Sequence, residues 1–363
     1  MKKSIISLAI AAGLIASMSA QAGDVKVKWF GFAQLTAKQG DGLDPGSPSS
    51  SATTDPTFGA DRVRFGFKIK DGNVFGKLQA DLNRKHESSA TKNGTLPEII
   101  KDIEAGYKFS NAASLKVGQF KTPVGMDFNT SGKKLDITQR GMEKGLVLER
   151  AVGVMLSGRK IANGGFGYDL FYGNPAGRGA ATAGGLTGNT NSMAARVMYD
   201  MGKMMHVELG YGIDETAATG AGFDDYEVLD FAVKAKMGKA HTIKFEYIDG
   251  SNVKGNSAVD ESVWYAHYGF LVNKSVELVG RHYQADIDVS GAGSADLTNT
   301  YLGANFFLGS NKTNGRVQVF YVVSGGDDGV SAAYPSGGVS AASKSASSAY
   351  YDDVILAQYQ VSF

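Results

Sequence analysis

The sequence predicts an all-β fold, a 16-stranded antiparallel transmembrane β-barrel, and three observations predict it. Apolar and polar residues alternate with a period of two through sixteen segments of about ten residues each. Long and short connections follow one another in strict alternation between these segments. The last segment keeps its alternation up to the terminal residue, Phe363. A membrane barrel accounts for all three features, because one face of each strand meets lipid and the first and last strands must pair.

Residues 1–22 are expected to be a cleaved signal peptide, and residues 23–363 the barrel domain. The positive start Lys2-Lys3 precedes an apolar run, and residues 20–22 read Ala-Gln-Ala, a cleavage pattern. The apolar run is short for a permanent span, and an uncleaved helical anchor is the alternative. We therefore expect export through the inner membrane and a location in a Gram-negative outer membrane.

The composition excludes several classes of protein. The 363 residues include 37 Lys and Arg, 36 Asp and Glu, and no Cys. An exported chain without cysteine is not a disulfide scaffold. A net charge of +1, or −1 once Lys2 and Lys3 are lost, indicates no nucleic-acid partner.

The strands of the first half are predicted from alternation alone. Val63, Phe65 and Phe67 share one face of a segment whose other face carries Arg62, Arg64 and Lys68. The same pattern predicts strands at about 25–38, 62–70, 74–85, 98–110, 113–121, 148–160, 165–173 and 191–200.

The second half repeats the pattern. Leu209 and Tyr211 oppose Glu208 and Gly210 in one segment, and Val319 and Tyr321 oppose Gln318 in another. Strands are predicted at about 206–213, 231–237, 240–249, 260–271, 274–284, 299–308, 316–323 and 351–363. A secreted soluble β-sandwich would also alternate, but sandwich domains are usually much smaller.

The connections indicate how the barrel is oriented. Short ones carry tight-turn residues, at 71–73, 111–112, 162–164, 201–203, 238–239, 273 and 309–314. Long ones, rich in Gly, Ser, Thr, Asn and Asp, lie at 39–59, 86–97, 122–147, 174–190, 214–225, 250–259, 285–298 and 324–350. Outer-membrane barrels place short turns at the periplasmic end and long loops outside.

Residues that face the lumen by parity are predominantly basic. Fifteen are basic: Lys26, Lys28, Arg62, Arg64, Lys68, Lys70, Lys77, Lys108, Lys116, Arg196, Lys234, Lys236, Lys244, Arg281 and Arg316. Eight are acidic: Asp81, Asp102, Glu104, Asp169, Glu208, Asp230, Glu246 and Glu277. Such an excess raises the local concentration of anions in a narrow bore. The alternative is that these charges pair with one another and only stiffen the wall.

The third long loop, 122–147, is more charged than the others. Lys121, Lys133, Lys134, Arg140, Lys144 and Arg150 in and beside it outnumber Asp127, Asp136, Glu143 and Glu149 by two. We expect Arg62, Arg64, Lys121 and Arg140 near the narrowest point of the pore, with Lys68, Lys133 and Lys134 completing an anion-binding constriction. Guanidinium groups suit oxyanions because they donate two parallel hydrogen bonds. The alternative is a solvated surface loop.

Residues 114–159 resemble a known family. The phrase Gly118-Gln119-Phe120-Lys121-Thr122-Pro123-Val124-Gly125, which leads from a strand into the third loop, is similar to one in the phosphate-selective porins of the O and P type. The resemblance implies a homotrimer of sixteen-stranded channels with an inward-folded third loop. The dense arginine ladder of the strict phosphate channels is absent here, so we expect a mild anion preference.

The sequence therefore predicts a porin for passive diffusion of small hydrophilic solutes, with phosphate and other oxyanions as candidate anions. Its expected partners are these solutes, outer-membrane lipid and further copies of itself. There is no Gly-x-Ser-x-Gly or His-Glu-x-x-His motif and no metal-ligand spacing, so no enzyme activity, cofactor or metal is expected. The alternative function is an adhesin or structural barrel that does not conduct.

Overall fold

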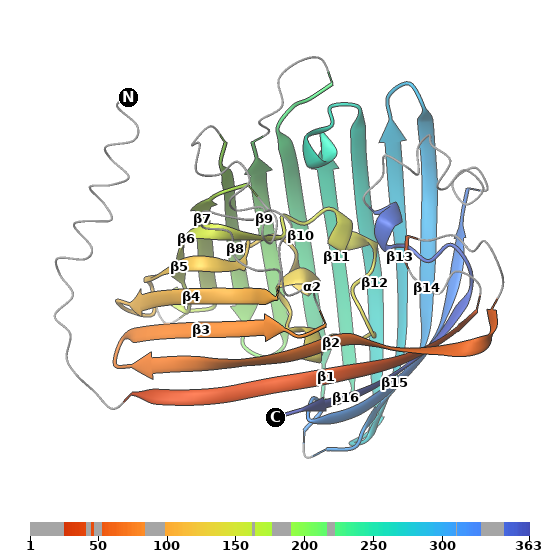
Figure 1. Ribbon diagram of the computed structural model, residues 1–363, viewed down its shortest axis with the longest axis horizontal. Coiled ribbons are helices and arrows are strands. Elements are labelled where there is room, and N and C mark those ends of the chain that lie inside the picture. Colours follow the sequence, from red (N-terminus) through yellow and green to blue (C-terminus); the bar gives the residue numbers. More distant parts are fainter. Residues whose placement is uncertain are drawn as a thin grey trace.

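The sheet of this protein closes on itself. The computed structural model describes residues 25–40, 45–46, 53–83, 99–161, 164–175, 190–215, 222–309, 311–327 and 345–363. Sixteen strands form one closed antiparallel barrel in which sequence neighbours pair and β1 pairs with β16 (Figure 1). The predicted fold class is confirmed. Within the described residues, no helix has both the length and the apolar character needed to cross a membrane.

The strands have the following bounds. The first eight are β1 (Lys26–Gly40), β2 (Thr53–Asp71), β3 (Val74–Asp81), β4 (Ile100–Lys108), β5 (Ser114–Lys121), β6 (Arg150–Gly158), β7 (Phe166–Gly173) and β8 (Ser192–Met201). The second eight are β9 (Met205–Asp214), β10 (Tyr226–Met237), β11 (His241–Ser251), β12 (Val259–Asn273), β13 (Val276–Val289), β14 (Gly293–Phe307), β15 (Gly315–Gly326) and β16 (Val354–Ser362).

Short helical turns lie in the connections. The segment between β5 and β6 holds α2 (Met126–Asn129) and the 3₁₀ turns η1 (Gly132–Lys134) and η2 (Met142–Gly145). Two further 3₁₀ turns are η6 (Val253–Gly255) and η7 (Ala346–Ser348). The predicted signal peptide, 1–22, and parts of several predicted long loops lie outside the described residues.

The two faces of the sheet differ as the alternation predicts. Leu209, Leu302 and Tyr359 project from the outer face and are 46–53% exposed. The alternate positions carry polar side chains that are buried, such as Glu208 and Gln318. Lipid would cover the outer face, and every strand has a hydrogen-bonded neighbour on both sides, as a span without access to water requires.

Barrel closure extends to the end of the chain. The register aligns Phe32 with Ser362, and the backbones of Gly31 and Phe363 exchange two hydrogen bonds of 3.3 and 3.1 Å. The Phe363 ring lies on the outer surface, 6.5 Å from the ring of Phe65 between centroids. The terminal aromatic residue therefore completes the seam between the first and last strands.

One predicted connection is wrong. The expected long loop at 285–298 is mostly strand, because β13 continues to Val289 and β14 begins at Gly293. The alternation continues here with Asp286, Asp288 and Asp296 exposed at every second position. Long and short connections thus do not alternate without a break, because this hairpin extends as paired strand beyond the expected end.

Gly118 on β5 provides a test of the packing between strands. Its φ is +126°, and an added Cβ would lie 2.1 Å from the carbonyl oxygen of Ile103. We expect Gly118→Ala to lower the unfolding free energy by at least about 1–3 kcal/mol, the usual cost of such backbone strain. Urea unfolding in detergent measures the change. Gly280→Ala on β13 is the control, since its Cβ would meet only Leu302 at 3.8 Å.

Candidate functional site

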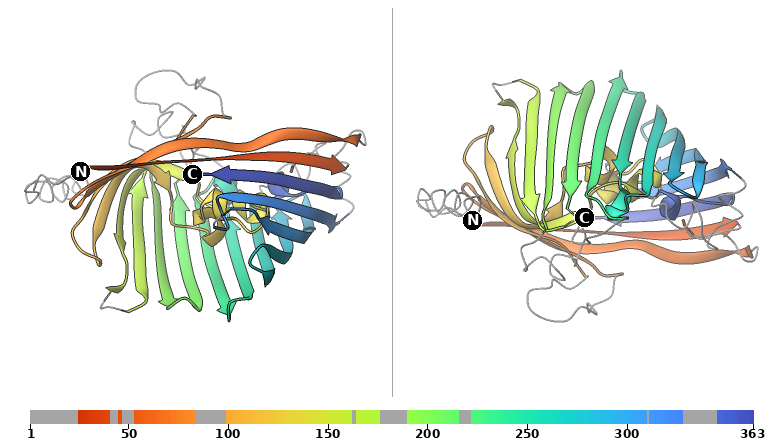
Figure 2. Two further views of the ribbon diagram at one scale, coloured as in Figure 1. Left: turned by 90° about the horizontal axis from the view of Figure 1, so that it is seen from below. Right: turned by 90° about the horizontal axis from the view of Figure 1, so that it is seen from above.

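The segment 122–147 is attached to side chains from more than half of the barrel strands. Among the described residues it contacts polar groups on β1, β2, β5, β10, β11 and β13–β16 through hydrogen bonds. Both views of Figure 2 show the coiled yellow segment beside strands of the cyan and blue half of the sheet. The strand side chains that make these bonds occupy the positions opposite the lipid-facing residues.

The strongest attachment is a buried ion cluster. The Asp127 carboxylate of α2 receives Lys244 Nζ at 2.9 Å and an Arg281 nitrogen at 2.6 Å. Asp136 of the same segment lies 2.5 Å from Lys244 and 3.5 Å from Arg281. Burial opposes ionisation of Asp127, but Arg281 and Lys244 outweigh it and hold its pKa well below the usual range. Two cations of the wall thus neutralise two carboxylates of the segment.

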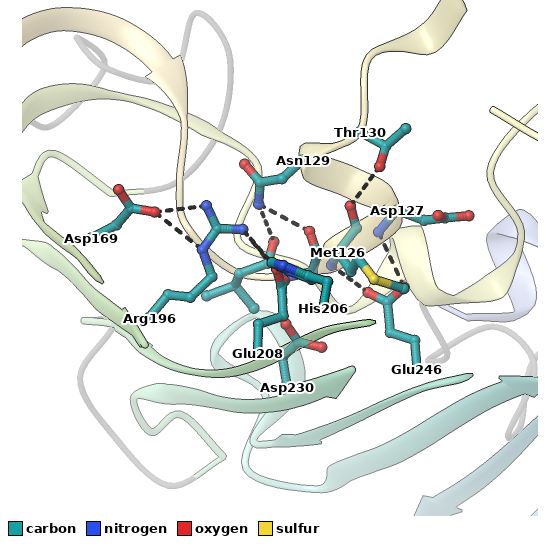
Figure 3. A network of polar contacts seen from close by, with 12 residues as sticks. Met126, Asp127, Asn129, Thr130, Asp169, Arg196, His206, Glu208, Asp230 and Glu246 are labelled. Atoms are coloured by element: carbon teal, nitrogen blue, oxygen red, sulfur yellow. Dashed lines mark hydrogen bonds and ion pairs between the residues drawn. The ribbon is translucent and has the colours of Figure 1, made fainter. Parts of the chain in front are cut away.

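The first turn of α2 is docked on two carboxylates of the wall. Glu246 on β11 accepts the backbone N–H groups of Met126 and Asp127 at 2.7 and 3.1 Å (Figure 3). Asp230 on β10 accepts the N–H of Gly125 at 2.9 Å. These bonds satisfy helix N–H groups that have no partner inside the helix.

The other end of α2 holds two cations without a carboxylate. Arg140 donates to the carbonyl oxygens of Asp127, Phe128 and Thr130 at 2.8, 3.0 and 2.5 Å. Lys121 Nζ donates to the last two of these carbonyls. Burial, together with the nearby guanidinium groups of Arg62 and Arg150, lowers the pKa of Arg140 to about 10, so it stays charged at neutral pH.

Three cationic side chains lie around the ring of Phe128. Its ring centroid lies 5.1 Å from Lys121 Nζ, 5.7 Å from the Arg140 guanidinium carbon and 6.0 Å from that of Arg150. Arg150 donates one nitrogen to Asp102 at 2.7 Å, and Arg64 donates one to Asp81 at 3.2 Å. We call Arg64, Lys121, Arg140 and Arg150 the cationic cluster.

Two cavities meet at this cluster, and both are lined by Arg64 and Arg150. The first, about 560 Å³, includes Pro45 and Ser347 from the long-loop end. The second, about 520 Å³, includes Lys28 from the short-turn end. Their strand residues come from β1–β8, and the segment 122–147 contributes further lining residues to both. The cluster therefore lies between spaces that belong to the two ends of the barrel.

The other candidate residues divide into two groups. Arg62 lines the first cavity but is buried, and it donates to Gln34 at 2.7 Å and to the carbonyl of Thr138 at 3.1 Å. It therefore helps to anchor the segment. Lys68 and Lys133 line the second cavity. Burial and the neighbouring charges of Lys134, Lys28 and Lys68 lower the pKa of Lys133, so these four ammonium groups lie near one another.

Lysines without an ion pair are concentrated on the short-turn side. Some lysines line the cavities of that end and make no ion pair with another described residue. They are Lys28, Lys68, Lys121, Lys133, Lys203, Lys234, Lys236 and Lys239. The carboxylates lining those cavities are all paired with a basic group: Asp102, Glu104, Asp169, Asp200, Glu208 and Glu277. Positive charge is therefore in excess in the second cavity and in two further cavities of the short-turn end, both of which are lined by Lys203 and Lys236.

Many predicted lumen charges instead pair with each other, as the alternative interpretation held. Arg196 on β8 bridges Asp169 at 2.7 Å and Glu208 at 3.3 Å, and His206 also contacts Glu208 (Figure 3). Lys116 pairs with Glu104 at 3.0 Å. Such pairs contribute little net charge to the bore, so the parity count overstates its positive excess.

Some contributors could not be recognised from the sequence. Arg150 was counted among the loop charges but not selected for the constriction, although it lines both cavities. Lys244 and Arg281 were assigned to the open lumen, whereas they bind Asp127 and Asp136. The signal in the sequence is the pair of aspartates, Asp127 and Asp136, in a segment whose basic residues outnumber its acidic ones. No cluster of three or more metal-ligating side chains occurs in the part of the chain that the structure describes.

Comparison with protein families yields one match. The model of the family described as phosphate-selective porin O and P matches residues 50–327. No curated protein matches the sequence.

Solved structures share the fold at low sequence identity. A Salmonella typhi OmpF complex with daunomycin aligns over 93% of this chain and 98% of its own, with 13% identity and a TM-score of 0.64. The trimer form of Vibrio cholerae OmpT covers 93% and 99%, with 14% identity and a TM-score of 0.59. An anion-selective porin from Comamonas acidovorans covers 94% and 100%, with 12% identity and a TM-score of 0.59.

The ion cluster predicts a large effect of a small substitution. Asp127→Asn leaves Arg281 and Lys244 with one carboxylate between them, and we expect a loss of about 3–5 kcal/mol in unfolding free energy. Urea unfolding in detergent measures it. Glu149→Gln is the matched control, because Glu149 pairs with the half-exposed Lys144 at 3.9 Å, and such pairs contribute at most about 1 kcal/mol. Equal losses in the two variants would contradict the assignment.

Proposed function

Because the chain belongs to the phosphate-selective porin O and P family, we propose that it forms a water-filled outer-membrane channel with a mild preference for anions. Small hydrophilic solutes diffuse through it passively. The family and the porin fold indicate a channel and not an enzyme. The observation that carries the anion preference is the cationic cluster, where Arg140 is held by carbonyl oxygens and stays charged at neutral pH.

The constriction follows from an inward course of the segment 122–147. Its bonds to nine strands support this course, because the strand side chains involved lie opposite the lipid-facing positions. Most of these bonds come from β10–β16, so solutes pass along the wall of β2–β8, where both cavities lie. Lys121 on β5 is the register partner of Arg150 on β6, and both line the second cavity with Arg64. Arg140 of the segment lines the first cavity with Arg64 and Arg150.

The chemistry of the cluster suits oxyanions. Arg64 and Arg150 each use one nitrogen on a carboxylate, and their terminal nitrogens make no hydrogen bond to another of the described residues. Guanidinium groups bind planar or tetrahedral oxyanions through two parallel N–H donors. Phosphate and carboxylate solutes are therefore the candidates for binding, and chloride follows by charge alone.

The surplus lysines extend the positive potential toward the short-turn end. Lys28 and Lys68, which are register partners on β1 and β2, line the second cavity together with Lys133. Short turns face the periplasm in outer-membrane barrels. An anion that passes the constriction therefore meets a positive vestibule, which favours its transfer onward and draws anions from the periplasmic side at low salt.

The assembly is proposed to be a homotrimer in the outer membrane. The trimer form of Vibrio cholerae OmpT supports it, since that protein shares the fold. Exposed apolar side chains around the barrel provide the surface for lipid and for neighbouring copies. Cleavage of a signal peptide after Ala22 belongs to the same proposal, since the expected localisation requires export.

An adhesin or structural barrel is the competing function. Planar-bilayer conductance separates the two, because a barrel of that kind would insert without passing ions. Failure to conduct in properly folded, detergent-purified protein would reject the channel.

Neutralising a cation at the cluster should weaken the anion preference. We expect Arg140→Gln to lower the anion-to-cation permeability ratio by about twofold, since it removes one full charge from a confined bore. The reversal potential in a KCl gradient measures the ratio.

Two variants control this experiment. Arg140→Lys keeps the charge with fewer donors and should retain most of the selectivity. Lys274→Gln removes the same charge from an exposed turn between β12 and β13 and should change nothing. An unchanged ratio in Arg140→Gln would place the selective step elsewhere.

The vestibule lysines make a separate prediction. Lys28→Gln combined with Lys68→Gln should reduce the block of chloride current by phosphate added on the short-turn side, with a smaller effect from the other side. The effect should fade at 1 M salt, where the Debye length is about 3 Å. Sided addition in single-channel recordings measures it, and an equal effect from both sides would contradict the assignment.

A further inference from the structure

A buried carboxyl group in the third loop has no hydrogen-bond donor from another residue. Glu143 lies on η2 and is 1% exposed. Neither carboxylate oxygen accepts a hydrogen bond from another described residue. The flanking Met142 and Leu146 are fully buried, so η2 is docked firmly through apolar contacts. A buried carboxylate without donors is costly, whereas a protonated carboxyl is tolerated.

The docking surface of η2 is formed by tyrosine rings and by the last long loop. Gly141 packs on the Tyr283 ring so closely that a Cβ would lie 2.5 Å from it. Tyr301 follows at 5.9 Å between ring centroids, and Tyr350 lies 6.4 Å from Tyr301. Gln139 donates to the Tyr350 hydroxyl at 2.7 Å. The segment before η2 is thus joined to the segment after η7.

The cations near Glu143 are engaged elsewhere. Arg281 on β13 is bound to Asp127 and to the Tyr283 hydroxyl. Arg140 donates to three backbone carbonyls. Lys144, the next residue, has a half-exposed side chain and lies 3.9 Å from Glu149.

The other titratable groups around Glu143 disfavour a negative charge. Asp127 on α2 and Glu246 on β11 are carboxyl groups within its electrostatic reach. Tyr265, Tyr283 and Tyr301 present buried rings from β12, β13 and β14. On the side of η7, Glu261 of β12 accepts the backbone N–H of Ser345 at 2.8 Å.

We propose that Glu143 is a proton-dependent latch, which holds η2 against the barrel wall and η7 when protonated and releases it when ionised. Gln139, Arg140 and Lys144 flank the latch and line the first cavity together with Ser347 and Ser348. Release of η2 therefore moves cationic side chains in the path to the constriction. The latch would let the pH of the medium modulate a channel whose charge pattern is otherwise constant.

The direction of the pH effect follows from linkage. Burial, and then the nearby Asp127, raise the pKa of Glu143 to about 7, above its ordinary value. A carboxyl group whose pKa is raised in the docked state stabilises that state. The stabilisation is complete at pH values below the pKa of the undocked group, near 4.3. This stabilisation is lost as the pH rises through about 7. The docked state is therefore favoured in acid and weakened at pH 8.5.

Thiol reactivity tests the latch in the intact trimer. The chain has no cysteine, so Met142→Cys introduces a single buried thiol next to Glu143. Lys144→Cys, on the exposed side of the same turn, is the reference that corrects for thiol ionisation. Between pH 5.5 and 8.5, we expect the ratio of the two rates with a small methanethiosulfonate to rise on the order of tenfold. In the Glu143→Gln background the ratio should stay low.

Single-channel recording of the cysteine-free chain provides a second measurement. The parent chain should show more frequent current transitions at pH 8.5 than at pH 5.5, and Glu143→Gln should lose this difference. A thiol-rate ratio independent of pH in the two cysteine variants, together with a transition frequency independent of pH in the parent chain, would overturn the latch. An equal pH response in Glu143→Gln would overturn it as well. The thiol assay does not depend on ion selectivity, so it can fail or succeed independently of the proposed channel function.

Discussion

The position of the third loop depends on two aspartates of the loop meeting two cations of the barrel wall. Asp127 and Asp136 would each be costly to bury alone, as would Lys244 and Arg281. Together they form one nearly neutral cluster at the junction of α2 with β11 and β13. Both the aspartates and the cations are removed from water. If either pair were withdrawn, the other would be left as buried charge without a partner, which costs several kcal/mol. The cluster therefore fixes where the loop lies, whatever the exact net energy of the pairs.

Much of what surrounds the pore follows from this fixed point. With α2 held by its first turn, its carbonyl end is directed toward β5 and β6, where Lys121 and Arg150 lie. The carbonyls of Phe128 and Thr130 then orient Arg140 and Lys121 without neutralising them. A chain with nearly equal numbers of acidic and basic residues thus concentrates uncompensated positive charge at one place.

The fold could be predicted from the sequence because lipid and water impose opposite demands on the two faces of each strand. That demand is visible residue by residue, as at Leu209 beside Glu208. Strand ends were less predictable, since alternation does not show where the membrane stops. Asp286, Asp288 and Asp296 illustrate this: their polarity suggested a loop, yet they are exposed positions of a paired hairpin. The polar residues indicate that this region is exposed to water. Only the backbone pairing shows that it is a strand and not a loop.

The site was only partly predictable, because parity gives the face of a residue and not its neighbours. Arg316 illustrates the difference: it faces inward as expected, but it donates to the carbonyl of Leu135 at 2.8 Å and is 3% exposed. Such a residue supports the loop and is shielded from solutes. Arg196 likewise faces inward, but two carboxylates compensate it. Selectivity should then depend on the charges that remain after pairing. A cation bound by backbone carbonyls keeps its net charge, whereas a carboxylate cancels the charge of the cation that it binds. The distinction between these two kinds of partner, which is set by the path of the loop backbone, leaves net positive charge at one place in a chain of balanced composition, and the proposed anion preference depends on it.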